Sequence, residues 1–304
     1  MAKVITEQNL RALIDLLVTD GKRVVGPKQA GSITLYEPLN NGEELTLGTL
    51  PRRSAKETFF PVSEPLLSFE KNTEGVRVTD VDTTSFPETV LVGALPCDAA
   101  APGILDAVFS WDYHDRFFLE RREKTTIVGL ACTTCDDACF CTLVGFSPRE
   151  TKGSDLFLTP LEGGGYQVEA ITAKGEKLLA AYPQLFEETQ DVKPLPLAAP
   201  EGEKVDLAKV KAWLDTHFED PLWEEIATRC AGCGACAFGK FTNHASGHNP
   251  RDVQNKRYRN RVMHKFSYYH DKFGHTLCTG CGRCVRACPV GIDIKAVLDE
   301  INGK

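Results

Sequence analysis

The chain has 304 residues, 42% of them apolar, which is enough for the cores of two domains at roughly 100 to 200 residues each. Charged residues make up 25% of the sequence and the formal net charge is −7, which argues against a general nucleic-acid binder. Apolar runs are too short to span a membrane, and the sequence from Met1 lacks the pattern of a signal peptide. We therefore expect a cytoplasmic protein without membrane insertion.

The first elements predicted along the chain are those of an α/β domain. Apolar residues recur at helical spacing over residues 10–17, and Thr6 can cap the start of that helix. Residues 89–94 and 125–130 are short β-rich runs separated by helix-like sequence, the pattern of a βαβ unit. Such strands are parallel neighbours, so their carboxyl ends should meet at one edge of the sheet.

A hairpin and a linker are predicted next. Two β-rich runs, 155–159 and 166–170, flank the glycines at 163–165. Those glycines could also hold a phosphate, but no Walker or dinucleotide-binding context accompanies them. Prolines are frequent over residues 183–204, which is typical of a linker. We expect an α/β domain over residues 1–204 and a helical, cysteine-rich domain over 205–304.

Twelve cysteines point to metal or redox chemistry, because cytosolic thiols are kept reduced. The strongest motif is Cys278-x2-Cys281-x2-Cys284-x3-Cys288-Pro289, the bacterial [4Fe–4S] pattern. Zinc ribbons also use paired C-x2-C units, but they do not add a third cysteine at x2 and a fourth before proline. The motif therefore predicts an iron–sulfur cluster.

A second run, Cys230-x2-Cys233-x2-Cys236, lies upstream. In two-cluster ferredoxins, the fourth cysteine of each run ligates the cluster of the other run. By that rule, Cys288 completes the cluster held by these three cysteines.

The other cluster retains the first three cysteines of the C-terminal motif: Cys278, Cys281 and Cys284. Its fourth ligand is expected shortly after Cys236, where Lys240 stands instead. Three alternatives remain open. The cluster is a [3Fe–4S] form, its fourth ligand comes from elsewhere, such as His244 or His248, or a stretch of chain is absent between Cys236 and Lys240.

A third group of cysteines follows the two parallel strands. Cys97 lies just past the first strand and Cys132 just past the second, and Cys139 and Cys141 follow in the same loop. Four thiolates could converge at this sheet edge and hold a further [4Fe–4S] cluster, with zinc or free thiols as alternatives. Cys97 could also be a nucleophile, although no histidine nearby is an obvious base for it.

Positive charge is concentrated between Arg251 and Lys272, where seven Lys or Arg residues stand against two Asp. A solvated helical face would explain this, and interleaved aromatic residues would also suit nucleic acid. The cysteine motifs on both sides favour a different role. Because a cluster with four thiolates is an anion, basic residues around it would compensate its charge, or would dock an acidic partner.

With these motifs the chain resembles the iron–sulfur β subunits of cytoplasmic sulfhydrogenases and the related hydrogenase and sulfur reductase B subunits, a family that also includes the A subunits of anaerobic sulfite reductases. The resemblance covers nearly the whole chain. It is carried by these segments: Phe59-Phe60-Pro61 with Glu64, Val92-Gly93-Ala94-Leu95-Pro96-Cys97-Asp98, Arg121-Arg122-Glu123, Gly129-Leu130-Ala131-Cys132, Cys139-Phe140-Cys141-Thr142, Ser246-Gly247-His248-Asn249-Pro250-Arg251 and His264-Lys265-Phe266.

The resemblance implies an N-terminal α/β domain with its own cluster and a C-terminal α-helical ferredoxin-like domain with two more, making three [4Fe–4S] clusters. Carried over by motif, the N-terminal ligands are Cys97, Cys132, Cys139 and Cys141, and Cys135 is left unassigned. Family members usually continue after their counterpart of Cys236 with another cysteine, a proline and a longer cysteine-containing stretch. That continuation is missing here, and with it the expected fourth ligand.

The function expected from these features is single-electron relay in an oxidoreductase complex. The partners would be a flavin- or NAD(P)H-handling subunit and a catalytic hydrogenase or reductase subunit. The sequence lacks dinucleotide-binding and Walker fingerprints and an evident acid–base pair, so catalysis by this chain alone is not expected. Reduction of a sulfur compound at the N-terminal cluster and a zinc-binding nucleic-acid module are the alternatives.

Overall fold

The computed structural model describes residues 1–73, 75–200, 205–229 and 242–304, and it divides into two compact units. The first unit comprises Met1–Thr134 and Pro148–Ala198. The second comprises Cys135–Ser147 and Ala199–Lys304. A short segment from the middle of the chain therefore belongs to the C-terminal unit, and each unit is described by itself.

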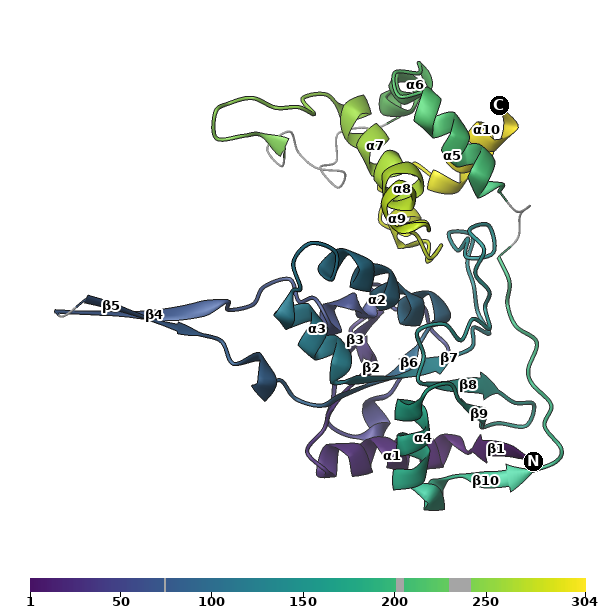
Figure 1. The fold of residues 1–304 in the computed structure, drawn as a ribbon. Coiled ribbons are helices and arrows are strands. Elements are labelled where there is room, and N and C mark those ends of the chain that lie inside the picture. The colour runs from purple at the N-terminus through teal and green to yellow at the C-terminus, as the bar shows by residue number, and fades with distance from the viewer. Residues whose placement is uncertain (74, 201–204, 230–241) are drawn as a thin grey trace. The chain divides into compact units, whose positions relative to one another are not determined.

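The first unit is built on an eight-stranded mixed sheet (Figure 1) with the strand order β10-β1-β9-β8-β7-β6-β2-β3. The strands are β1 (Ala2–Ile5), β2 (Arg23–Ala30), β3 (Ile33–Leu39), β6 (Thr89–Ala94), β7 (Thr125–Leu130), β8 (Leu156–Pro160), β9 (Tyr166–Ala170) and β10 (Glu187–Thr189). The neighbours β2, β6, β7 and β8 run parallel, and the outer pairs are antiparallel. This confirms the predicted α/β fold class and the parallel β6–β7 pair.

Helices cover both faces of this sheet. They are α1 (Glu7–Thr19), α2 (Pro96–Phe109), α3 (Arg116–Glu123) and α4 (Ala173–Ala181), with short 3₁₀ turns at Gly42–Glu44, Ala55–Thr58, Thr83–Ser85 and Pro183–Leu185. Buried residues of α1 and α4 share one core with Val90 and Val128. Buried residues of α2 and α3 share another with Leu91 and Ile127. Consecutive residues of β6 and β7 thus face opposite cores, as alternation along a strand requires.

Of three further predictions for this unit, two are confirmed and one is wrong in part. Helix α1 begins as predicted, because the hydroxyl of Thr6 accepts a hydrogen bond from the Asn9 N–H at 3.1 Å. Strands β8 and β9 pair as the predicted hairpin. The linker predicted over residues 183–204 is wrong for Glu187–Thr189, which pair with β1 as an edge strand. Proline content there indicated loop, but three residues between prolines suffice for a short strand.

Strands β4 (Leu67–Asn72) and β5 (Gly75–Asp80) form a separate antiparallel pair, named the ribbon below. In Figure 1 the ribbon extends away from the sheet of the first unit.

The second unit is helical, as predicted. Its elements are α5 (Leu207–Thr216), α6 (Leu222–Thr228), α7 (Gln254–Met263), a π-helical turn (His264–Tyr268), α8 (Tyr269–Phe273), α9 (Arg283–Arg286) and α10 (Ile294–Gly303). Trp223 and Phe266 are buried at its centre, and Phe140 from the segment 135–147 joins the same core. Within the described ranges, none of the helices is long and apolar enough to cross a membrane.

Candidate metal centre

The C-terminal cysteine motif lies in the loop before α9 and continues past it. Gly280 and Gly282 adopt φ values of 66° and 72°, a left-handed conformation that lets the loop turn back on itself between cysteines. Cys278 is buried, and burial raises the pKa of its thiol, opposed by the positive charge of Lys265. A thiolate there needs compensating positive charge, such as a metal centre provides.

The remaining cysteines of the motif are Cys281, Cys284 and Cys288. Cys281 and Cys284 both act electrostatically on Cys278, so the three thiols lie near one another. The sulfur of Cys288 accepts a hydrogen bond from the Ile292 N–H at 3.2 Å. Backbone N–H groups directed at thiolate sulfur are a common feature of iron–sulfur ligation. In donor type the motif therefore fits a [4Fe–4S] cluster.

Several predicted ligands lie beyond the residues that the structure describes. Cys230, Cys233, Cys236 and the position of Lys240 fall in the undescribed range 230–241, so the assignment of Cys288 to their cluster stays a prediction. Of the alternative histidines, the backbone N–H of His244 donates to the His248 carbonyl at 2.8 Å, and the two rings are 5.5 Å apart.

The N-terminal cysteines are divided between the two units. Cys97 is the second residue of α2, directly after β6, and Cys132 lies two residues beyond β7, so both stand at the carboxyl edge of the parallel strands. Cys139 and Cys141 belong to the second unit. The four-thiolate set predicted for this region stays a prediction. Among the described residues, no three His, Cys, Asp or Glu side chains stand together in metal-binding geometry.

The structure brings Cys139 and Cys141 together with Cys135, which the sequence left unassigned. Burial raises the pKa of the Cys141 thiol to about 11, and the thiols of Cys139 and Cys135 add to that shift. Cys135 itself is exposed. Half-buried thiols whose pKa is raised in this way are stabilised as thiolates by a neighbouring cation.

The segment that carries these thiols packs against the loop of the C-terminal motif. The Phe140 N–H donates to the Gly280 carbonyl at 2.9 Å. A Cβ on Gly280 would lie 2.4 Å from the Cα of Cys141, and one on Gly282 would lie 2.3 Å from the Ala138 carbonyl oxygen. The two backbones can approach this closely only because both positions are glycine.

Arg286 connects the two cysteine groups through its guanidinium. It donates to the Asp136 carboxylate at 2.9 Å, to the sulfur of Cys139 at 3.1 Å and to the Cys281 carbonyl at 2.9 Å. The hydrogen bond from Arg286 lowers the pKa of Asp136 to about 2. The carboxylate therefore stays ionised and holds the cation beside Cys139.

Arg259 and Lys265, two residues of the basic stretch, contact groups outside it. The side chain of Arg259, largely buried, donates to Glu219 at 2.7 Å and lies 3.7 Å from the centre of the Phe218 ring. Lys265 donates to the Leu277 carbonyl at 3.1 Å, immediately before Cys278. The expected charge compensation thus rests on Lys265 and on Arg286, which lies outside the stretch.

Several residues that carry the family resemblance support the fold around Cys97. The carboxylate of Asp98 is fully buried and accepts hydrogen bonds from the hydroxyls of Tyr36 at 3.0 Å and Ser54 at 2.8 Å. Glu64 pairs with Arg121 at 2.6 Å, both side chains being nearly buried. Neither role can be derived from sequence spacing, because each partner comes from a distant segment.

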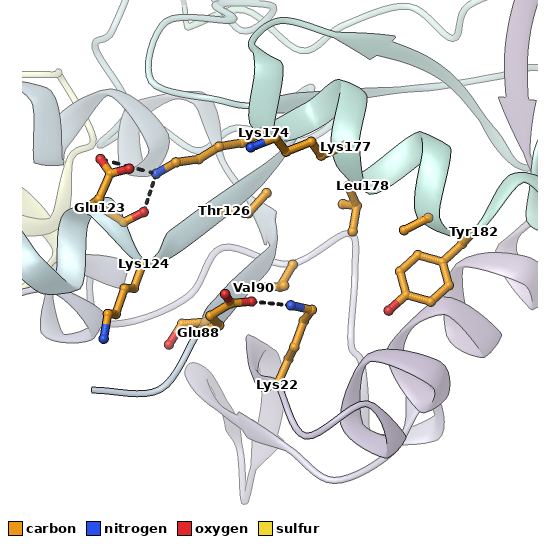
Figure 2. A pocket seen from close by; sticks show the side chains of 12 residues that line it. Lys22, Glu88, Val90, Glu123, Lys124, Thr126, Lys174, Lys177, Leu178 and Tyr182 are labelled. Carbon is orange, nitrogen blue, oxygen red and sulfur yellow. Dashed lines mark hydrogen bonds and ion pairs between the residues drawn. The ribbon is translucent and has the colours of Figure 1, made fainter. Parts of the chain in front are cut away.

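A cavity of about 420 Å³ lies at the amino ends of β6 and β7, at the opposite end of these strands from Cys97 and Cys132 (Figure 2). The charged side chains that line it are Lys22, Glu88, Glu123, Lys124, Lys174 and Lys177. Lys22 forms an ion pair with Glu88. Lys174 forms an ion pair with the Glu123 carboxylate and donates hydrogen bonds to the backbone carbonyls of Glu123 and Thr125. No local sequence pattern indicates this cavity, because its lysines are scattered along the chain.

Residues 216–292 match the 4Fe–4S dicluster domain family, a range that includes both C-terminal cysteine runs. The chain is also 29% identical to sulfhydrogenase 2 subunit beta of Pyrococcus furiosus, in a match that covers 92% of each chain. The chain is therefore similar to a sulfhydrogenase β subunit over nearly its whole length. These findings confirm the resemblance that the motifs indicate, together with [4Fe–4S] clusters as cofactors. The number of clusters and their individual ligands stay predictions.

Proposed function

We propose that this chain is an electron-transfer subunit that relays single electrons through [4Fe–4S] clusters within an oxidoreductase complex. Its partners would be a flavin- or NAD(P)H-handling subunit and a catalytic subunit of hydrogenase, sulfur reductase or sulfite reductase type. The dicluster domain and the match to a hydrogenase β subunit support this role. Clusters supply one-electron chemistry, and the protein supplies their spacing and electrostatics.

The observation that carries the proposal is the packing of the Cys139–Cys141 segment onto the loop of Cys278, Cys281 and Cys284. Two groups of thiols meet within one unit, with backbone contact at Gly280 and the Arg286 guanidinium between them. Electron transfer requires redox centres close together in a low-dielectric setting. Neighbouring clusters on these two groups would meet that requirement.

The ligand assignment belongs to the same proposal. Cys97, Cys132, Cys139 and Cys141 would hold the N-terminal cluster, and Cys288 would complete the cluster of Cys230, Cys233 and Cys236. Cys278, Cys281 and Cys284 would hold the third cluster, as a [3Fe–4S] form or with a ligand from elsewhere.

The test is iron and acid-labile sulfide on protein purified without oxygen, with low-temperature EPR before and after dithionite. About twelve irons with three reduced signals would support the full relay, since each cubane cluster holds four irons. About eleven irons, with a three-iron signal in the oxidised state, would support the relay with an incomplete third cluster. Zinc in place of iron, in a colourless protein, would overturn the proposal.

A second function is favoured by one observation, the exposure of Cys135 beside Cys139 and Cys141. An exposed thiol next to a cluster could bind a sulfur compound for reduction there. The isolated chain would then reduce sulfite or polysulfide with a reduced viologen as electron donor, and Cys135→Ser would abolish that turnover. Absence of turnover in the iron-loaded chain would rule this function out.

A further inference from the structure

The ribbon of β4 and β5 is exposed over its whole length. Every described residue of both strands is exposed to solvent, and the two strands pair only with each other. In Figure 1 the ribbon stands out from the first unit, away from its sheet. An isolated two-stranded ribbon is marginally stable in water, so it normally gains stability from a surface on which it packs.

The register of the ribbon makes it amphipathic. Residues directly opposite each other in an antiparallel pair share a face, and Phe69 is opposite Val78. Leu67 and Val76 lie two residues away along each strand, so they join the same face. The opposite face is polar and consists of Ser68, Glu70, Asn72, Gly75, Arg77 and Thr79. The apolar face is turned to solvent, and its Phe69 is 69% exposed.

The base of the ribbon is fixed to the first unit. Glu64, three residues before β4, pairs with Arg121 of α3 at 2.6 Å in a nearly buried contact. Asp80, the last residue of β5, pairs with Arg116 of α3 at 3.6 Å. Two ion pairs to one helix restrain the two strands where they leave the fold. The ribbon therefore projects from the first unit in an orientation that is fixed at its base.

The chain before β4 also exposes apolar side chains. Phe60, Val62 and Leu66 are 50%, 86% and 58% exposed. Together with the four apolar residues of the ribbon, they expose on the order of 800 Å², the share that one partner contributes to a standard protein–protein interface. Exposed apolar surface on this scale is typical of a site of interaction with another protein.

We infer that the apolar face of the ribbon is the docking surface for another subunit of the complex, one that offers an apolar groove. The identity of that partner as a complex subunit rests on the proposed function. Charge disfavours a second copy of this chain, because copies with a net charge of −7 repel each other. Lys71 brings a positive charge to the outer end of the apolar face, so the groove should hold a carboxylate there.

The test uses the complex isolated by a tag on this chain from the cells that produce it. A photo-crosslinking benzoylphenylalanine replaces Phe69 on the apolar face or, as matched control, Thr79 on the polar face. Mass spectrometry should identify a crosslink from position 69 to a different polypeptide that is present in the complex in stoichiometric amount. The yield of that crosslink from position 79 should be much lower. Crosslinks to a second copy of this chain, equal crosslinks from both positions or none from either would overturn the inference.

A pair of double variants gives an independent measure. Phe69→Ser with Val78→Ser should weaken association with the crosslinked subunit at least tenfold, whereas Glu70→Ser with Thr79→Ser on the polar face should leave it nearly unchanged. Unweakened association of the first variant would also overturn the inference. Iron content and EPR signals should be the same in both variants, because the cysteines lie outside the ribbon. Failure of the proposed electron transfer would appear in those signals and not in the crosslinks.

Discussion

Arg286 and Cys139 are 147 residues apart in the sequence, yet the guanidinium Nη2 lies 3.1 Å from the cysteine sulfur. The same guanidinium is held by the ionised Asp136 and reaches the carbonyl of Cys281. A single cation therefore contacts both cysteine groups of the second unit. Because a cluster becomes more negative on reduction, such a cation stabilises its reduced state.

Replacing Arg286 by Gln should lower the reduction potential of one cluster. We expect a shift on the order of 50 mV, because a hydrogen bond to a charged group contributes roughly 1.5–3 kcal/mol and only part of that depends on oxidation state. Potentiometric EPR titration measures the shift. Arg283→Gln, which removes the same charge from the same helix α9, should shift the potential less. Equal shifts in the two variants would mean that only the overall charge matters.

Gly280→Ala should separate the two cysteine groups. The new Cβ would meet the Cα of Cys141 at 2.4 Å. The Cβ is fixed to one backbone and the Cα belongs to another, so neither atom can move aside cheaply. Gly274→Ala is the matched control, since Gly274 also has positive φ but nothing within 4 Å of an added Cβ. The control should lose about 1 kcal/mol of unfolding free energy. Gly280→Ala should lose more and also bind less iron, measured by denaturation and iron analysis.

Cys97→Ala should remove one cluster and leave the EPR signals of the C-terminal pair in place. The loss should be about four irons per chain, the content of one cubane cluster. Cys135→Ala, which removes the unassigned thiol, should retain all of the iron. If Cys97→Ala keeps its full iron content while Cys135→Ala loses iron, Cys135 replaces Cys97 in the ligand set.

Tyr182→Phe should destabilise the first unit in a pH-dependent way. Burial and the hydrogen bond to Asp20 raise the pKa of Tyr182 to about 12, above the usual value of 10. Its stabilising effect is therefore complete below pH 10 and is lost as the pH rises from about 10 to about 12. At pH 8 the variant should lose roughly 1.5–3 kcal/mol, the range for a hydrogen bond to a charged group.

The check on Tyr182→Phe is urea denaturation of the wild type and the variant at pH 8 and at pH 11, monitored by circular dichroism. The difference in unfolding free energy between the two proteins should shrink at pH 11. A difference that stays constant would show that the hydroxyl acts by packing and not through its ionisation.

Local sequence patterns determined the parts of this protein that depend on short-range geometry. The cysteines from Cys278 to Cys288 follow one another closely in the sequence, so their spacing alone predicts a cluster, and the family match agrees. The βαβ pattern predicted that β6 and β7 are parallel, because the helical crossover returns the chain to the end of the sheet where the first strand began. Thr6 predicted the start of α1, because an N-cap side chain bonds to a backbone N–H within the first turn of its helix.

Only the tertiary structure decided which unit holds Cys139 and Cys141. Sequence order placed them with Cys132, but the segment packs on Gly280 and joins the helical core through Phe140. That choice depends on backbone contact between distant residues, which no local pattern encodes. The exposure of the ribbon was also decided only by the tertiary structure. Leu67 and Phe69 are typical of an ordinary strand, and only the fold shows that their apolar face lacks a covering layer in the described residues.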